Sequence, residues 1–180
     1  MEPALCRQQN RSRSSAHGRR PQGRRRKKGA DGEALGRSRG GFSTKIQIRA
    51  EGLGRPVTFA LTGSEVHDSK AFFTLMGTGW IKRVGRGRPR LKPDRLAADK
   101  AYSSGVIRSF LRRCGIEPVI PAKSNEKRDH AFDREPYRKR NRVERLINRL
   151  KQFRRIAARY EKRAVNYLAM ITIAALLLWL

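Results

Sequence analysis

Polar and apolar positions alternate along the chain where its apolar content first rises. Residues 44–50 have the period of two that a half-buried strand produces, and the segment VTFALT predicts a second strand at 56–62. Between them, EGLGRP supplies the glycines and the proline of a turn. The sequence therefore predicts an antiparallel hairpin.

The hydrophobic pattern predicts alternating helices and strands beyond this hairpin. In chain order we expect a helix at 68–76, a strand ending at Asp99, a helix from Ser103 or Ser104 to Cys114, a strand at 116–121 and a helix from Pro136 to Arg159. Gly115 is placed to stop the second of these helices. This order of elements predicts an α/β fold.

The C-terminal residues 167–180 are apolar apart from Thr172. Their 14 residues fall short of the about 20 that a helix needs to cross a bilayer. A basic helix precedes them, which is also the arrangement of a tail anchor. We expect a buried terminal helix in preference to an anchor.

Residues 1–40 are poor in apolar side chains and rich in Arg, Ser and Gly, with a basic cluster at 24–28. This composition predicts a disordered basic arm that lies along DNA, followed by one domain at 41–180. Residues 81–95 form a second basic stretch, which we expect to be a Gly- and Pro-rich loop.

The charge of the chain indicates a polyanionic partner. Lys and Arg number 43 against 15 Asp and Glu, which gives a formal net charge of +28 and argues against a small-molecule enzyme. Nucleic acid is the favoured partner, with a ribosome-associated protein or a membrane-surface binder as alternatives. Cys6 and Cys114 lie far apart in a chain without a secretory signal, so neither a disulfide nor a zinc site is expected.

The helix predicted from Pro136 places acidic and basic side chains on one stripe. At about 100° per residue, Tyr137, Arg140, Glu144 and Lys151 lie within about 60° of one another. A neighbouring arc is apolar and is expected to be buried, and it consists of Val143, Leu146, Ile147, Leu150 and Phe153. A surface helix with intrahelical ion pairs is the alternative interpretation.

The same four residues have the spacing of a signature found in insertion-sequence transposases: Tyr, two residues, Arg, three residues, Glu, six residues, Lys. The segments ALGRSRGGFSTKI, LTGSEVHDS, ADKAYSS, VIPAKSN and NYLAMITIAALLLWL also resemble that family. Residues 34–180 are thus similar to the DDE transposases of bacterial insertion sequences, of the IS-four/IS-five kind.

The resemblance implies a ribonuclease-H-like mixed sheet with flanking helices and a site of three carboxylates. Asp99 and Glu144 match the second and third carboxylates, which in the family hold two Mg²⁺ or Mn²⁺ ions for DNA strand cleavage and transfer. The resemblance also implies a homo-oligomer in the bacterial cytoplasm, associated with the nucleoid, that acts on double-stranded DNA at terminal inverted repeats. The expected DNA contacts are Tyr137, Arg140, Arg142, Arg145 and Lys151.

The opening aspartate of the family has no match in this chain. The family carries it on a strand ahead of the GRSRGG segment, where this chain has PALCRQQNRSRSSAHGRRPQGRR without an acid. Asp31 lies too close to GRSRGG, and Asp68 is expected to begin a helix. We therefore expect the first strand to be missing, through truncation or a frameshift. The resulting hypothesis is a chain that binds DNA without cutting it, with a non-enzymatic basic nucleic-acid-binding protein as the alternative.

Overall fold

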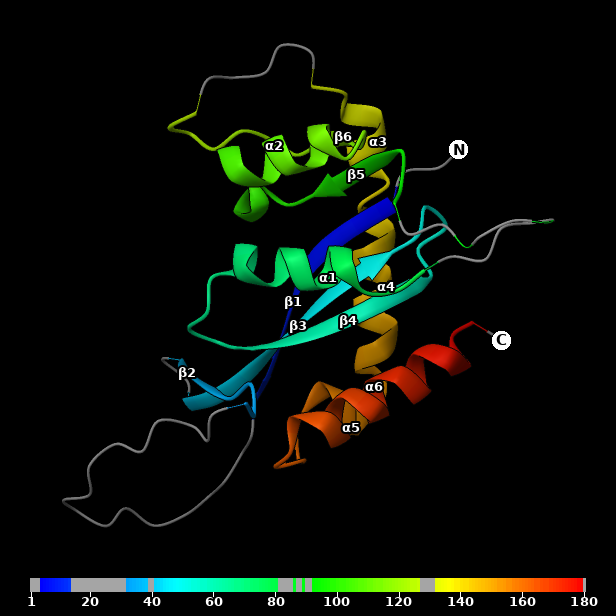
Figure 1. Ribbon diagram of the computed structural model, residues 1–180. Coiled ribbons are helices and arrows are strands. Elements are labelled where there is room, and N and C mark those ends of the chain that lie inside the picture. The colour runs from blue at the N-terminus through cyan, green and yellow to red at the C-terminus, as the bar shows by residue number, and fades with distance from the viewer. Residues whose placement is uncertain are drawn as a thin grey trace.

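A computed structural model of the chain describes residues 4–13, 32–38, 41–80, 86, 89, 92–126 and 132–179, with the backbone alone for 4–13. Its centre is a mixed sheet with helices on both faces (Figure 1). The hydrophobic core is correspondingly divided into two clusters of buried residues, one on each face of the sheet.

The predicted hairpin is confirmed as strands β3 (Gly41–Ala50) and β4 (Pro56–Gly63). The two strands are antiparallel, and the register pairs Ile48 with Phe59. A short strand, β2 (Gly36–Ser38), pairs with the beginning of β3.

Strand β1 (Ala4–Arg13) corrects two expectations, the missing first strand and the disordered arm over the whole of 1–40. It lies in the sheet between β3, to which it is antiparallel, and β5 (Arg95–Ala98), to which it is parallel. Backbone groups on both of its edges are therefore paired with neighbouring strands, which supports a strand in spite of its low apolar content. Residues 1–3, 14–31 and 39–40 of the expected arm lie outside the described residues.

The second half of the sheet follows the predicted order. A 3-10 turn, η2 (Lys100–Tyr102), comes after β5, and helix α2 (Gly105–Arg113) leads to strand β6 (Glu117–Val119), which is parallel to β5. Ser104 caps α2 by accepting a hydrogen bond from the Ile107 N–H, 3.2 Å away. Gly115 ends it with a φ of +70°, a value that glycine adopts without steric cost. The strand order is β2-β3-β1-β5-β6, and β4 also pairs with β3.

The two faces of β3 differ in chemistry, although both are buried. Ile46, Ile48 and Ala50 belong to the core cluster that also contains residues of α4 (Asn141–Lys151) and α6 (Ala164–Leu177). The opposite face presents buried polar side chains, among them Lys45, Gln47 and Arg49. Over this face lie η1 (Asp68–Ala71) and α1 (Phe72–Gly77), which confirm the helix predicted at 68–76.

The single long helix predicted from Pro136 to Arg159 is wrong. The structure has α3 (Arg134–Arg138), α4 and α5 (Arg154–Ala157) instead. Between α3 and α4 the backbone continues through 3-10-type hydrogen bonds, while Phe153 adopts an extended conformation and interrupts the helix. This interruption places Ile156 in the core.

The predicted buried face of α4 is confirmed for Val143, Leu146, Ile147 and Leu150, while Phe153 is partly buried. Helix α6 is buried on only one side, because Val165, Ile173, Leu176 and Leu177 are exposed. Among the described residues, no helix has the length and apolar content needed to cross a membrane.

Candidate active site: Asp99, Arg140 and Glu144

Asp99 is the first residue after β5 and stands at the carboxyl end of that strand. Its backbone is extended, and its carbonyl accepts a hydrogen bond from the Tyr102 N–H at 2.9 Å. The Asp99 carboxylate makes no capping hydrogen bond to η2, and its side chain is 27% exposed. The carboxylate is therefore available to groups from other elements.

Arg140 joins Asp99 to Glu144. Its Nη2 lies 2.9 Å from Oε1 of Glu144, and its Nη1 lies 3.9 Å from Oδ2 of Asp99. The Arg140 side chain is only 16% exposed, so this cation is largely removed from water. The guanidinium thus lies near two carboxylates that are 45 positions apart in the sequence, while its Nη1 is buried without a hydrogen-bond partner among the described residues.

Aromatic rings support Arg140. The centre of its guanidinium lies 5.2 Å from the centroid of the Tyr137 ring, within range of a cation–π interaction. Phe132 packs against Tyr137 with the ring centroids 5.4 Å apart. The sequence pattern had grouped Tyr137 with Arg140, but it gave no signal for Phe132.

The β3–β4 turn anchors the first turn of α4 beside this site. Arg142 donates a hydrogen bond through Nη1 to the carbonyl of Gly52. Gly54 has a φ of +88°, and a Cβ at this position would lie 2.9 Å from the Cβ of Arg142. The close approach requires glycine, and it fixes the start of the helix that carries Glu144.

Contacts with Arg140 bring together Asp99, Tyr137 and Glu144. Among the other predicted DNA contacts, Arg145 and Lys151 are exposed on α4, while Arg142 is half-buried against the β3–β4 turn. Arg142 therefore has a structural role that its sequence position did not indicate.

The residues present do not fit a two-ion metal site. Strand β1 has no Asp or Glu in its sequence, and its register with β5 pairs Cys6 with Ala98, so position 7 lies beside Asp99. Across the part of the chain that the structure describes, no group of three or more His, Cys, Asp or Glu side chains is arranged to hold a metal ion. The site therefore offers two carboxylates, those of Asp99 and Glu144, and both lie near the Arg140 guanidinium.

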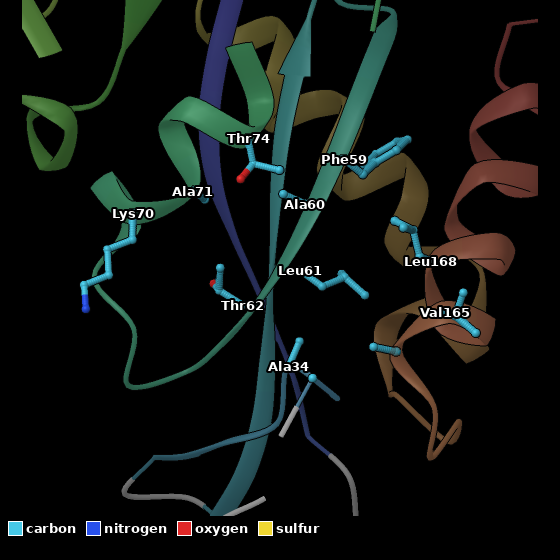
Figure 2. A pocket seen from close by; sticks show the side chains of 12 residues that line it. Ala34, Phe59, Ala60, Leu61, Thr62, Lys70, Ala71, Thr74, Val165 and Leu168 are labelled. Carbon is cyan, nitrogen blue, oxygen red and sulfur yellow. The ribbon is translucent and has the colours of Figure 1, made fainter. Parts of the chain in front are cut away.

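A separate cavity of about 420 Å³ lies beside β4 and contains none of the four site residues. Figure 2 shows that β4 contributes its floor, with α6 on one side and η1 and α1 on the other. Its lining is mainly apolar, and Lys70 is the one titratable residue among the side chains that line it. This cavity offers no grouping of catalytic side chains.

The chain is similar to known proteins over most of its length. The family model described as "Transposase DDE domain" matches residues 11–179 and so begins within β1. A protein from Burkholderia cepacia named "Putative transposase for insertion sequence element IS402" is 36% identical over 121 residues, which cover 67% of this chain and 55% of that protein. The chain therefore spans about half the length of this relative.

A second relative, from Brucella ovis, is named "Putative transposase for insertion sequence element IS6501". It is 26% identical over 141 residues, which cover 77% of this chain and 99% of that protein. Together with the family match over residues 11–179, these similarities identify the chain as a member of the transposase DDE domain family, among the transposases of insertion sequences.

Proposed function

We propose that this chain takes part in DNA transposition by binding the ends of an insertion sequence along α3 and α4. The observation that carries the proposal is the meeting of Asp99, Arg140 and Glu144, which come from the end of a central strand and from the α3–α4 segment. Membership of the transposase DDE domain family supports the same conclusion.

The basic residues around this site suit a DNA backbone. Exposed cations follow α3 and α4 on both sides of Glu144, namely Arg138, Arg145, Arg149 and Lys151. Each Lys or Arg that neutralises a phosphate releases counterions, so we expect affinity for duplex DNA to fall steeply with salt concentration. Arg side chains also bind phosphate oxygens through two N–H groups at once.

We further propose that the chain alone binds DNA without cleaving it. Transposases of the kind that this chain resembles use three carboxylates with Mg²⁺ or Mn²⁺, and β1 supplies no carboxylate. Asp99 and Glu144 are in addition partly neutralised by Arg140. A third carboxylate beside Asp99 would be required for strand cleavage and transfer, and β1 occupies the place in the sheet from which it would come.

Fluorescence anisotropy tests the DNA-binding part of this proposal. The full chain is titrated against labelled duplexes that carry either the terminal inverted repeats of its insertion sequence or a scrambled sequence. Arg145→Gln combined with Lys151→Gln is expected to weaken binding by about tenfold, because two phosphate contacts are lost. Arg112→Gln combined with Arg113→Gln is the matched control, because it removes the same charge from exposed positions on α2. Equal losses in the two double variants would contradict binding along α4.

Incubation of the same duplexes with Mg²⁺ tests for cleavage. We expect no nicking by the chain alone. Nicking that disappears in Glu144→Gln would show instead that two carboxylates suffice for the reaction.

A second candidate function is a non-enzymatic nucleic-acid-binding protein, which is favoured by the net charge of +28 and by the absence of an acid from β1. The two functions predict a different dependence of binding affinity on the DNA sequence. Equal affinity for the inverted repeats and for the scrambled duplex would favour this second candidate.

A further inference from the structure

The cation shared by Asp99 and Glu144 is a side chain of the protein itself. We propose that Arg140 is the resident cation of this site and that it keeps divalent metal ions from binding there. This inference deepens the proposed function, because it gives a physical reason why the chain would bind DNA without metal-dependent cleavage.

The distances define a three-residue charge cluster. Arg140 contacts Glu144 at 2.9 Å and Asp99 at 3.9 Å, so both carboxylates lie within the range of strong attraction to one guanidinium. With both acids ionised, the cluster has a single net negative charge. A hard divalent cation prefers several anionic oxygens, and here it would meet a fixed positive charge between the two that are present.

Packing limits how far Arg140 can move away. Its side chain is 16% exposed, and Tyr137 lies against the guanidinium at 5.2 Å, itself held by the ring of Phe132. The backbone around Arg140 is also fixed by hydrogen bonds from the Arg140 N–H to Tyr137 and from the Val143 N–H to Arg140, both at 3.0 Å. A metal ion that binds Asp99 and Glu144 must therefore displace a side chain that is held on several sides.

The absence of an acid from β1 favours Arg140 over a metal ion as the partner of Asp99 and Glu144. A third carboxylate near position 7 would offset the charge of Arg140 and add another oxygen ligand, but β1 contains no Asp or Glu. Removing the guanidinium should therefore increase the affinity of the remaining carboxylates for a metal ion.

Binding of Mn²⁺ to the full chain, followed by electron paramagnetic resonance of the free ion, tests the inference. Wild type is expected to bind Mn²⁺ weakly, and Arg140→Gln to bind one ion at least about tenfold more tightly, since a nearby unit charge is worth more than that in a partly buried site. Arg138→Gln is the matched control, because it removes an exposed Arg from α3 with the same change in net charge. The affinity gained in Arg140→Gln should disappear when Asp99→Asn is added.

Two results would overturn the inference. One is tight binding of a single Mn²⁺ by wild type that Arg140→Gln fails to strengthen, and the other is an equal change in Arg140→Gln and Arg138→Gln. Arg140→Lys provides a second test if Arg140→Gln does not fold, as judged by circular dichroism. It keeps the charge, so its Mn²⁺ affinity should stay at the wild-type level. The assay contains no DNA, so the proposed DNA binding can fail or succeed independently.

Discussion

Lys45 and Asp68 form a buried ion pair that joins β3 to η1, with Nζ 3.2 Å from Oδ1. Gln47 donates a second hydrogen bond to the same Asp68 oxygen at 3.0 Å, and the Tyr102 hydroxyl donates to Oε1 of Gln47 at 2.7 Å. Lys45 also donates to the carbonyl of Val66. The Lys45 and Gln47 side chains of β3 are therefore buried with hydrogen-bond partners, which explains how a strand that contains them can lie inside the sheet.

Asp68→Asn should destabilise the fold by about 3 kcal/mol, because it leaves the buried Lys45 ammonium without its counter-charge. The free energy of unfolding in urea measures this loss. Glu135→Gln is a control at an exposed position of α3, and it should change stability by less than about 0.5 kcal/mol. A similar small change for Asp68→Asn would contradict a structural role for the ion pair.

Local patterns in the sequence were sufficient for the elements that carry Asp99 and Glu144. The apolar run before Asp99 and the arc from Val143 to Leu150 identified β5 and the buried side of α4. They failed for β1, whose stability depends on backbone pairing with β3 and β5, segments distant in the sequence. The position of Arg140 between two carboxylates is likewise a tertiary contact, and helical spacing alone predicted its proximity to Glu144 but not to Asp99.

Arg159 connects the C-terminal helices to the residues ahead of β2. Its substitution should therefore lower the free energy of unfolding. Its Nη1 donates to the carbonyl of Glu33 at 2.8 Å and to Oγ1 of Thr44 at 2.6 Å, and Nη2 donates to the carbonyl of Lys162. Burial lowers the pKa of the Arg159 guanidinium, although Tyr167 and Glu33 oppose the shift. An arginine nevertheless stays charged, so these contacts depend on its cation.

We therefore expect Arg159→Gln to lower the free energy of unfolding by about 3 kcal/mol or more. Arg159→Lys should recover little of that loss, because an ammonium lacks the planar set of donors that reaches all these acceptors. Thermal unfolding followed by circular dichroism would measure both variants. Arg155→Gln is the exposed control nearby, and a loss of stability there equal to that of Arg159→Gln would contradict the role assigned to Arg159.

Glu126 should make stability depend on pH. The pKa of Glu126 is lowered, chiefly by the hydrogen bond from the Ser103 hydroxyl at 2.5 Å and next by the Lys123 N–H. A lowered folded pKa means that the ionised form stabilises the fold. This contribution is complete above the ordinary glutamate value of 4.5 and is lost as the pH falls through the lowered value.

Wild type should therefore exceed Glu126→Gln in unfolding free energy at pH 7, and the difference should shrink as the pH is lowered below 4.5. Urea unfolding at a series of pH values measures the difference. A gap between the two proteins that stays constant across this range would mean that the carboxylate charge of Glu126 is not the stabilising feature.

Arg7→Asp should supply the carboxylate that β1 lacks. Position 7 comes one residue after the Cys6–Ala98 pair, beside Asp99, and its antiparallel partner on β3 is Ile48. Directly paired positions share a face of the sheet, and the Ile48 side chain lies in the core cluster that includes Val143 of α4. An aspartate at position 7 is therefore expected on the face where Glu144 approaches Asp99.

Mn²⁺ affinity should rise in Arg7→Asp by about tenfold or more, because a cation is removed and a third anionic ligand is added. Gln8→Asp is the matched control, since successive strand positions face opposite sides of the sheet and its β3 partner is Gln47. The gain should also disappear when Glu144→Gln is added to Arg7→Asp. An equal gain in Gln8→Asp would show that added negative charge alone attracts the ion, and that β1 does not occupy the register on which the argument depends.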